Sequence, residues 1–406
     1  MSALSHLVVL DLSRILAGPW AGQMLADLGA EVIKVERPGS GDDTRAWGPP
    51  FVHDAQTQAR GDAAYFLCAN RNKKSLTVDF TQPEGQGIVR RLAMQADVVI
   101  ENFKVGGLEA YGLDHAALRA LNPRLVVCSI TGFGQDGPYA SRPGYDFLIQ
   151  GMGGLMSVTG RAAGEPGAGP QKVGVALTDI MTGMYASVGI LAALAHRDRT
   201  GEGQHIDMGL LDVQVAVLAN QAMNYLVSGK VPQPMGNAHP NIVPYQDFPT
   251  ADGHVIIAVG NDTQFVRLCD AAGSAELGSD ARFATSAARV QHRDVLIPLL
   301  SACTATRTTA QWIAALEIAN VPCGPINRLD AVFDDAQVRA RGMQLDLPHA
   351  AAGTVPSVAN PIHLSATPVS YHQAPPTLGE HTREILAQRL DLDDAEIDVL
   401  AARGIV

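Results

Sequence analysis

One aspartate in this chain stands where a carboxylate could do covalent chemistry. Asp179 lies between an apolar run, residues 173–177, and a long apolar pattern with helical spacing, residues 180–194. A carboxylate at the start of a helix accepts hydrogen bonds from the first free N–H groups, and these bonds favour its ionised form. An ionised carboxylate that is partly removed from water is also a usable nucleophile. The local pattern therefore leaves two interpretations open, a helix N-cap or a catalytic nucleophile.

The composition excludes several classes of partner. The 406 residues are 47% hydrophobic and 17% charged, which is typical of a soluble globular protein with room for two domains. The formal net charge of -11 argues against nucleic acid, because phosphate binding needs a basic surface. No window reaches about 18 uninterrupted apolar residues, and the N-terminus shows no basic segment followed by an apolar one, so we expect no membrane span.

The cysteines and histidines do not form a metal or disulfide pattern. The five cysteines are widely spaced, odd in number and without a Cys-x-x-Cys pair, and no His-Glu-x-x-His motif is present. We therefore expect free thiols in a reducing cytoplasm, and neither a disulfide framework nor a metal site. The cysteines are Cys68, Cys128, Cys269, Cys303 and Cys323.

Short apolar strands alternate with helical patterns over the first 130 or so residues. This alternation predicts an α/β fold with a Rossmann-like parallel sheet covered on both faces, and ligands bind beyond the carboxyl ends of such strands. None of the turns at these ends carries Gly-x-Gly-x-x-Gly or a P-loop. Thr81 to Glu84 resembles a capping box that opens a helix. The predicted strands are 7–10, 31–36, 75–79, 97–101 and 125–130, and the predicted helices are 19–28 and 81–95.

The later part of the chain predicts a smaller domain. A strand over 204–208 and a helix over 210–226 precede a turn-rich stretch, residues 228–250. A compact group with a strand at 254–259 and a helix at 263–272 follows. We expect a large domain from residues 1–224, a smaller α/β domain from 225–325, and a C-terminal segment, 326–406, that returns to the large domain.

At this point the sequence resembles the class III CoA-transferases, the CaiB/BaiF family, over almost its whole length. The resemblance is carried by a series of motifs in order: Leu-Asp-Leu-Ser-Arg-Ile-Leu-Ala-Gly-Pro (10–19), Gly-Ala-Glu-Val-Ile-Lys-Val-Glu-Arg-Pro (29–38), Gly-Asp-Asp-Thr-Arg-Ala-Trp-Gly-Pro-Pro (41–50), Asn-Arg-Asn-Lys-Lys-Ser (70–75), Val-Ile-Glu-Asn-Phe (99–103), Ser-Ile-Thr-Gly-Phe-Gly-Gln-Asp-Gly-Pro (129–138), Thr-Asp-Ile-Met-Thr-Gly (178–183) and Pro-Cys-Gly-Pro-Ile-Asn (322–327).

The resemblance implies that Asp179 is the nucleophile. In the family an aspartate in this segment attacks an acyl-CoA thioester and forms a mixed anhydride, and CoA thiolate then converts it to an aspartyl-CoA thioester. The acceptor carboxylate runs these steps in reverse. Coenzyme A is then a substrate, and no cofactor or metal is needed. The family also forms interlocked-ring homodimers, so the resemblance implies one here.

The resemblance further implies a CoA site lined by Ala17, Arg37, Lys73, Asn102 and Phe103, to which the cationic stretch adds Arg71. Ala110 and Leu16 stand where formyl-CoA transferase has a CoA-contacting arginine and a glutamine, which argues against formyl or oxalyl substrates.

Racemases of the family place a histidine in the motif Arg-x-Gly-His-Asp, whereas this chain has Tyr145 at that position. Tyrosine, with a reference pKa of about 10, is a poor general base near neutral pH. A racemase is therefore the weaker alternative, and a catalytically silent CoA-binding protein is another.

Within the family the sequence most resembles succinyl-CoA:glutarate CoA-transferases, through the stretches around 41–51, 71–75 and 242–248. A dicarboxylate has a second carboxylate that an arginine fork would bind. The candidate arginines are Arg14, Arg45, Arg71 and Arg142, and their order is left open. The predicted acyl pocket consists of Leu16, Arg45, Trp47, Tyr145 and the loop residues Gly236, Asn237 and His239.

Overall fold

The computed structural model describes residues 2–406, which fall into two compact units. Unit 1 contains the residues up to Leu155, Val173–Leu226 and Ala336–Val406. Unit 2 contains Met156–Lys172 and Val227–Asp335. This division differs from the predicted boundaries, because residues 156–172 group with unit 2 and the second unit extends ten residues beyond 325.

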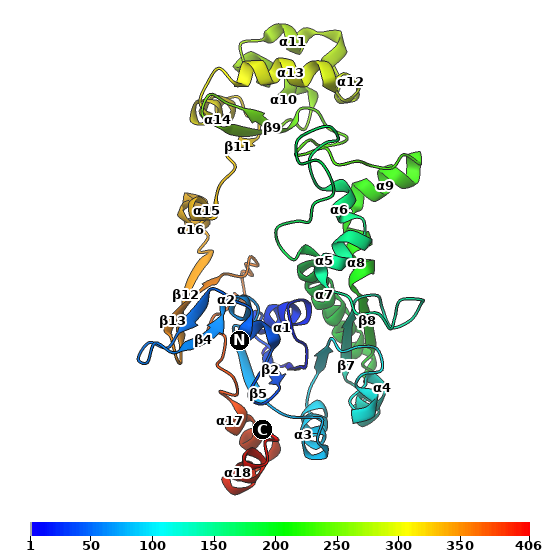
Figure 1. Cartoon of the computed structure of the whole chain (residues 1–406), viewed down its shortest axis with the longest axis vertical. Coiled ribbons are helices and arrows are strands. Elements are labelled where there is room, and N and C mark those ends of the chain that lie inside the picture. Colours follow the sequence, from blue (N-terminus) through cyan, green and yellow to red (C-terminus); the bar gives the residue numbers. More distant parts are fainter. Residues whose placement is uncertain (1) are drawn as a thin grey trace. The chain divides into compact units, whose positions relative to one another are not determined.

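Unit 1 is built on a six-stranded parallel sheet with the strand order β5-β2-β1-β6-β7-β8. Counted along the chain, this is the order 3-2-1-4-5-6 of a doubly wound fold, and the order reverses between β1 and β6. The Rossmann-like sheet predicted from the alternating pattern is therefore present. The strands are β1 (Val8–Asp11), β2 (Glu31–Glu36), β5 (Lys73–Thr77), β6 (Val98–Glu101), β7 (Val126–Thr131) and β8 (His205–Gly209). Figure 1 labels the strands β5, β2, β7 and β8 of this sheet.

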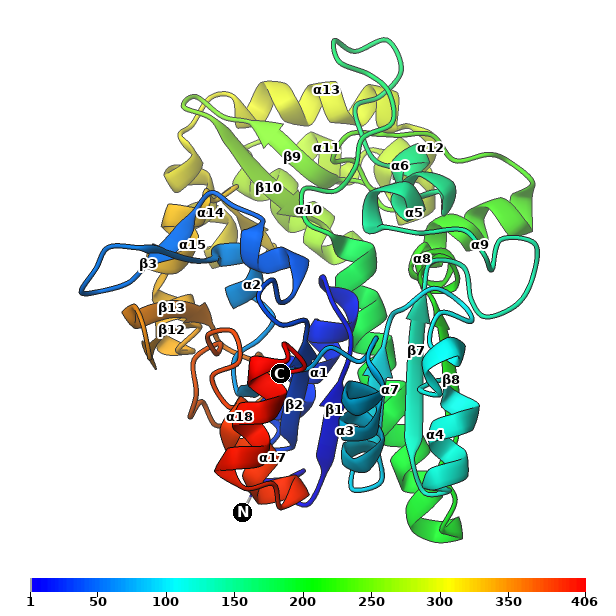
Figure 2. The same cartoon turned by 60° about the horizontal axis from the view of Figure 1, so that its bottom comes forward.

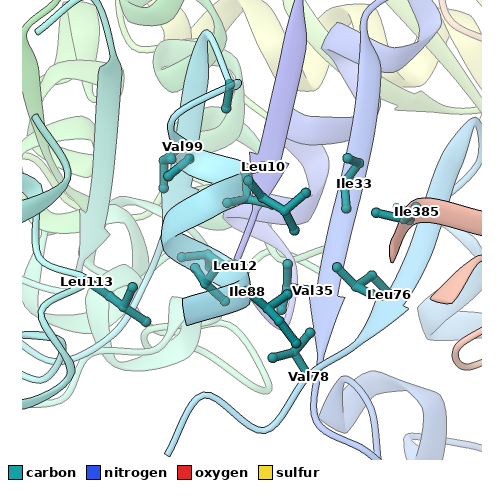
Figure 3. Close-up of a cluster of buried hydrophobic side chains, with 14 of the residues drawn as sticks. Leu10, Leu12, Ile33, Val35, Leu76, Val78, Ile88, Val99, Leu113 and Ile385 are labelled. Carbon is teal, nitrogen blue, oxygen red and sulfur yellow. The ribbon is translucent and has the colours of Figure 1, made fainter. Parts of the chain in front are cut away.

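Each strand sends neighbouring residues to opposite faces of the sheet, as the period of two requires. Leu10, Ile33 and Val99 belong to one buried cluster, shown in Figure 3, and Val9 and Val32 belong to the other. Helices α1 (Ala17–Asp27) and α7 (Leu177–Thr200) supply the second cluster. Helices α3 (Pro83–Ala93), α4 (His115–Leu121), α17 (Thr382–Leu390) and α18 (Asp394–Ala402) supply the first.

The two ends of the chain share this unit. Helix α17, red in Figures 1 and 2, packs against α3 and β5. The remaining elements of unit 1 are the 3-10 helices η1 (Asp43–Ala46) and η2 (Glu109–Tyr111), the hairpins β3 (Phe51–His53) with β4 (Arg60–Ala63) and β12 (Gln344–His349) with β13 (Gly353–Val358), and the helices α2 (Ala64–Leu67), α5 (Asp146–Met152), α8 (Leu210–Val217) and α16 (Ala336–Ala340). Helix α9 (Ala219–Ser228) begins in unit 1 and ends in unit 2. Helix α6 (Leu155–Val158) lies where the chain first passes into unit 2.

Unit 2 has its own sheet and core. Its three strands are β9 (Tyr245–Pro249), β10 (His254–Ala258) and β11 (Cys323–Gly324), in the order β11-β10-β9. Phe248, Val255 and Trp312 are buried at its centre. Its helices are α10 (Asp262–Ala271), α11 (Ala275–Ser279), η3 (Ala281–Phe283), α12 (Ser286–Gln291), α13 (Arg293–Thr304), α14 (Thr309–Ile318) and α15 (Leu329–Asp334).

Two local predictions are wrong. The Thr81 hydroxyl bonds to Asp79 instead of capping α3, whose N-cap is Gln82 with no side-chain cap. The single helix predicted over 210–226 is broken at Leu218, after which Ala219 takes a positive φ of 45°. That conformation is unfavourable for a residue with a Cβ and ends the regular helix.

Helix α7 is the one helix within residues 2–406 that is long and apolar enough to cross a membrane by length and composition alone. Half of its most apolar window is buried inside the protein. Ala186, Ile190 and Leu194 belong to the cluster between α7, α1 and the sheet. These are the features of a core helix.

Candidate active site

The candidate site lies where the strand order reverses. The loops after β1 and β6 meet there, and they are joined by two hydrogen bonds: the Arg14 N–H donates to Asn102 Oδ1 at 2.9 Å, and Asn102 Nδ2 donates to the Arg14 carbonyl at 2.7 Å. Ile15 has a φ of 74°, which is strained for a β-branched residue. Strain of this kind persists only where surrounding bonds hold the backbone, so the loop is fixed before any ligand arrives.

Two pockets open at this edge of the sheet. The Asp179 pocket has a volume of about 360 Å³ and is lined by Leu16, Ala17, Asn102, Tyr145 and Asp179 among others. The Arg37 pocket has a volume of about 480 Å³ and lies over the ends of β1, β2 and β5. Arg14, Phe103 and Gly107 line both pockets. The pockets are therefore neighbours that share one wall.

Asp179 is buried in the wall of its pocket, with 7% of its surface exposed. It is the third residue of α7 and not its N-cap, so the capping prediction is wrong. The cap comes from Asp146, whose Oδ1 accepts hydrogen bonds from the N–H groups of Thr178 at 2.9 Å and of Asp179 at 3.4 Å. The Asp179 carboxylate itself accepts no hydrogen bond from any residue that the structure describes.

Burial and the neighbouring Asp146 charge raise the pKa of Asp179 to about 7. Both causes disfavour the charged form, since one removes water and the other adds a like charge. The prediction that hydrogen bonds at a helix start would favour ionisation is thus wrong for this residue. A carboxyl with such a pKa is partly ionised at neutral pH, and its lone pairs are not occupied by donors.

A glycine lets α1 approach α7 at the site. A Cβ on Gly183 would lie 2.7 Å from the Ala17 carbonyl oxygen and 3.0 Å from Trp20 Cβ. Only glycine fits such a close approach. The contact holds the first turn of α1, with Leu16 and Ala17, beside the first turn of α7, and so brings these residues into the Asp179 pocket.

A tyrosine that we did not predict also lies near Asp179. The pKa of Tyr65 is raised to about 12 by burial and by the charge of Asp179. Its ring meets the Trp47 ring edge to face, with centroids 5.4 Å apart. Trp47 itself lines the Arg37 pocket and not the Asp179 pocket. Nothing in the short sequence around residue 65 distinguishes it from a packed tyrosine.

Three of the predicted cationic residues are buried in ion pairs. Lys73 Nζ lies 2.9 Å from Asp11 Oδ2, and both side chains are fully buried. Arg71 forms a fork on Asp27 and also donates to the Val358 carbonyl. Arg45 forms a fork on Glu36, with a further bond to Asp62. Their donors are engaged within the fold.

Arg37 and Phe103 have a different setting. Arg37 is exposed on the lip of the Arg37 pocket and forms no ion pair within residues 2–406. Phe103 lies on the wall between the two pockets, with the Arg14 guanidinium 5.8 Å from its ring centroid. The Arg14 Nε is buried without a hydrogen-bond partner among the described residues. Two cationic groups therefore have donors available for an anion here.

The predicted loop over the site belongs to unit 2. Gly236 donates its N–H to the Gly160 carbonyl, Asn237 Nδ2 donates to Asp247, and His239 packs against Tyr245 with ring centroids 5.2 Å apart. These contacts lie inside unit 2, so a role for the loop over Asp179 stays a prediction. Among residues 2–406, no group of three His, Cys, Asp or Glu side chains could hold a metal ion.

Comparison with known proteins agrees with these motifs. The sequence profile described as CoA-transferase family III matches residues 4–382. The succinate–glutarate CoA-transferase of Agrobacterium fabrum is 54% identical over 95% of both chains. The succinyl-CoA:glutarate CoA-transferase of Homo sapiens is 42% identical over 98% of this chain and 88% of its own.

A solved structure has the same fold. The crystal structure of a CAIB/BAIF family protein from Brucella suis superposes with a TM-score of 0.83 at 52% identity, covering 96% of this chain and 99% of that one. The profile, the identity over nearly full length and the fold agree, and the chain belongs to CoA-transferase family III.

Proposed function

We propose that this enzyme transfers CoA from succinyl-CoA to a second dicarboxylate, such as glutarate, through covalent intermediates on Asp179. One observation carries the proposal: a buried carboxylate without hydrogen-bond donors, part of the wall of a pocket at the switch point of a doubly wound sheet. The names of the similar proteins from Agrobacterium fabrum and Homo sapiens support the choice of succinyl and glutaryl groups.

In the proposed reaction an Asp179 oxygen attacks the thioester carbonyl carbon, the carbon–sulfur bond breaks, and CoA thiolate leaves an aspartyl–succinyl anhydride. The thiolate attacks the aspartyl carbonyl, succinate departs, and Asp179 carries CoA as a thioester. The acceptor carboxylate then attacks this thioester and expels the thiolate, which takes the acceptor acyl group and frees the Asp179 carboxylate. Covalent catalysis divides one difficult transfer into easier steps, and this series of reaction steps needs no metal.

We assign the CoA phosphates to the Arg37 pocket and the thioester to the Asp179 pocket. The exposed Arg37 and the unpartnered Nε of Arg14 supply positive charge, and Phe103 lies on the wall that joins the two pockets. Ala17 and Asn102 line the Asp179 pocket beyond that wall. We leave Arg71 and Lys73 out of this site because their charged groups are buried in ion pairs. We propose that these two residues stabilise the fold and do not bind CoA.

We also propose that the protein is a homodimer. Tyr185, Val188 and Leu191 recur every three residues on α7, so they share one face, and they are 43%, 63% and 37% exposed. Apolar faces of this kind commonly mark protein interfaces. Light scattering should give twice the mass of one chain, and a monomer at working concentration would contradict the proposal. A cytoplasmic location stays a prediction, in keeping with five cysteines that are all free in the structure.

The mechanism is tested by trapping the intermediate. Wild-type enzyme mixed with succinyl-CoA should show a peptide containing Asp179 whose mass has grown by CoA less one water. Asp179→Ala should lose both the adduct and turnover, whereas Asp346→Ala, at an exposed aspartate on β12, should keep both. Full turnover by Asp179→Ala would refute the mechanism.

The same assay in heavy water separates the alternatives. Transfer should give a new thioester without added deuterium. Deuterium uptake without acyl exchange would identify a racemase, which Tyr145 disfavours. Binding of succinyl-CoA with neither adduct nor product would identify a silent CoA-binding protein.

A further inference from the structure

We propose that Arg142 binds the distal carboxylate of the dicarboxylate substrate and thereby sets the preference of the enzyme for dicarboxylic acyl groups. This inference rests on the proposed function and adds to it a specificity residue. The sequence alone left four arginines as candidates, and their surroundings in the structure now distinguish them.

The other three arginines have carboxylate partners. Arg45 and Arg71 are buried, and both form forks on acidic residues of the fold. Arg14 lies 2.8 Å from Asp43, and it lines the wall that both pockets share. Arg142 is exposed and forms no ion pair with any residue that the structure describes. It lines the Asp179 pocket but not the Arg37 pocket.

The guanidinium of Arg142 is held by two aromatic rings. Its central carbon lies 4.5 Å from the Tyr139 ring centroid and 5.2 Å from the Phe133 ring centroid. The two rings themselves meet edge to face at 5.5 Å. The two ring contacts restrict the guanidinium. Its N–H groups make only a 4.0 Å side-chain contact with the Met152 sulfur, and their spacing suits a carboxylate bound in bidentate fashion. The group is therefore preorganised for an anionic partner that the protein itself does not provide.

The backbone connects this arginine to the nucleophile. Arg142 N–H donates to the Tyr139 carbonyl at 2.9 Å, which closes a turn. A Cβ on Gly144 would come within 2.5 Å of Gly132 Cα, so the segment after the turn lies directly on the backbone that follows β7. Four residues after Arg142, the Asp146 carboxylate accepts the N–H of Asp179. Arg142 and Asp179 are thus positioned by one continuous, hydrogen-bonded segment in the wall of one pocket.

A lysine offers the nearest competing cation. Lys104 is also exposed and lines the Asp179 pocket, but it follows Phe103 on the loop that forms the wall shared with the Arg37 pocket. That location suits the CoA moiety, which every acyl-CoA carries. Residues 140–145 line the Asp179 pocket and not the Arg37 pocket, and we place the acyl group beside them. Recognition of the distal carboxylate therefore falls to Arg142.

The test compares two acyl groups of equal length in identity exchange. Succinyl-CoA is mixed with isotope-labelled succinate, and butyryl-CoA with labelled butyrate, so that each assay involves a single acyl group. Arg142→Gln should lower kcat/KM for succinate exchange by roughly 10- to 100-fold, as expected for loss of a charge-assisted pair. It should leave butyrate exchange within about twofold of wild type, and Arg142→Lys should lie between. Arg124→Gln, an exposed arginine before the opposite end of β7, should match wild type with both acids.

The possible outcomes distinguish failure of the role of Arg142 from failure of the proposed CoA transfer. If the wild type exchanges succinate and Arg142→Gln does so at the same rate, the role of Arg142 is overturned while the proposed function stands. An equal loss with both acyl groups would also overturn it, since it would place Arg142 on CoA or in the fold. Absence of any wild-type exchange would defeat the proposed function and the inference together. Where wild-type butyrate exchange is too slow to measure, inhibition by free glutarate and by glutarate monoamide replaces it. Arg142→Gln should raise the Ki of glutarate and leave the Ki of the monoamide unchanged.

Discussion

Replacing Asp179, the proposed nucleophile, by asparagine, its uncharged isostere, should stabilise the protein, and the gain in stability should grow with pH. Asp179 has a pKa raised from 3.8 to about 7 by burial and by Asp146. A raised pKa in the folded state means that the protonated carboxyl is tolerated and the carboxylate is not. The contribution of the group to stability is thus fully present below about pH 4 and is lost as pH rises through about 7. Asp179→Asn removes the ionisation and with it this loss.

The magnitude follows from the width of that interval. The pKa of Asp179 lies about three pH units above its ordinary value, and each unit corresponds to about 1.4 kcal/mol. The wild type therefore gives up at most about 4 kcal/mol between pH 4 and pH 8 through this residue. We expect the two proteins to unfold alike near pH 4. At pH 8 the variant should have a Tm several degrees higher, since about 1 kcal/mol shifts Tm by roughly 2–4 °C in a domain of 150–250 residues.

The assay is thermal unfolding of wild type and Asp179→Asn between pH 4 and pH 8. The mass of the variant should be checked after each run, because hydrolysis of the amide would restore the acid. Asp346→Asn, at an exposed aspartate, serves as the control and should show no pH-dependent difference. A stability difference that is absent, or that stays constant across this range, would refute the assignment of a raised pKa to Asp179.

Two further predictions separate catalysis from fold. Asp146→Asn removes the like charge but keeps an oxygen that accepts the Thr178 N–H, so the pKa of Asp179 should fall. The acidic limb of the kcat/KM profile should then move to lower pH. An unmoved limb would mean that burial alone raises the pKa of Asp179. Arg71→Ala leaves the buried Asp27 with only asparagine partners and should cost about 3–5 kcal/mol in denaturant unfolding, with KM for succinyl-CoA unchanged in the folded fraction. A raised KM at unchanged stability would instead restore Arg71 to the CoA site.

The parallel sheet was predictable because its signal is local. Buried strands are short apolar runs, and the strands at 31–36 and 97–101 agree with β2 and β6 to within one residue. Strand order, however, could not be read from these runs, since it depends on which strands pair. The location of the pockets at the β1–β6 reversal follows from that order and so became visible only in the structure.

The roles of individual charged residues were less predictable, because their partners are distant in the sequence. Asp146 caps α7 from 32 residues away, which left Asp179 as the apparent local cap. Arg71 meets Asp27 across 44 residues, and Lys73 meets Asp11 across 62. A basic stretch such as Arg71 to Lys74 looks the same in sequence whether it faces a ligand or the core. Only tertiary packing decides between the two.

The same ion pairs distinguish Asp179 from the other buried aspartates. Four aspartates are buried among residues 2–406, and Asp11, Asp27 and Asp42 each contact a lysine or arginine. Asp179 is the fourth, and it has no cation and no donor within the described residues. The Lys34 charge and the bonds from Lys34 and Thr44 outweigh burial and lower the pKa of Asp42 to about 2, but they engage its lone pairs. Asp179 lacks such partners, so its ionised form is destabilised and its lone pairs are free, as the proposed nucleophile requires. Among residues 2–406, the proposed nucleophile is thus the one buried aspartate that the fold leaves without a lysine or arginine partner.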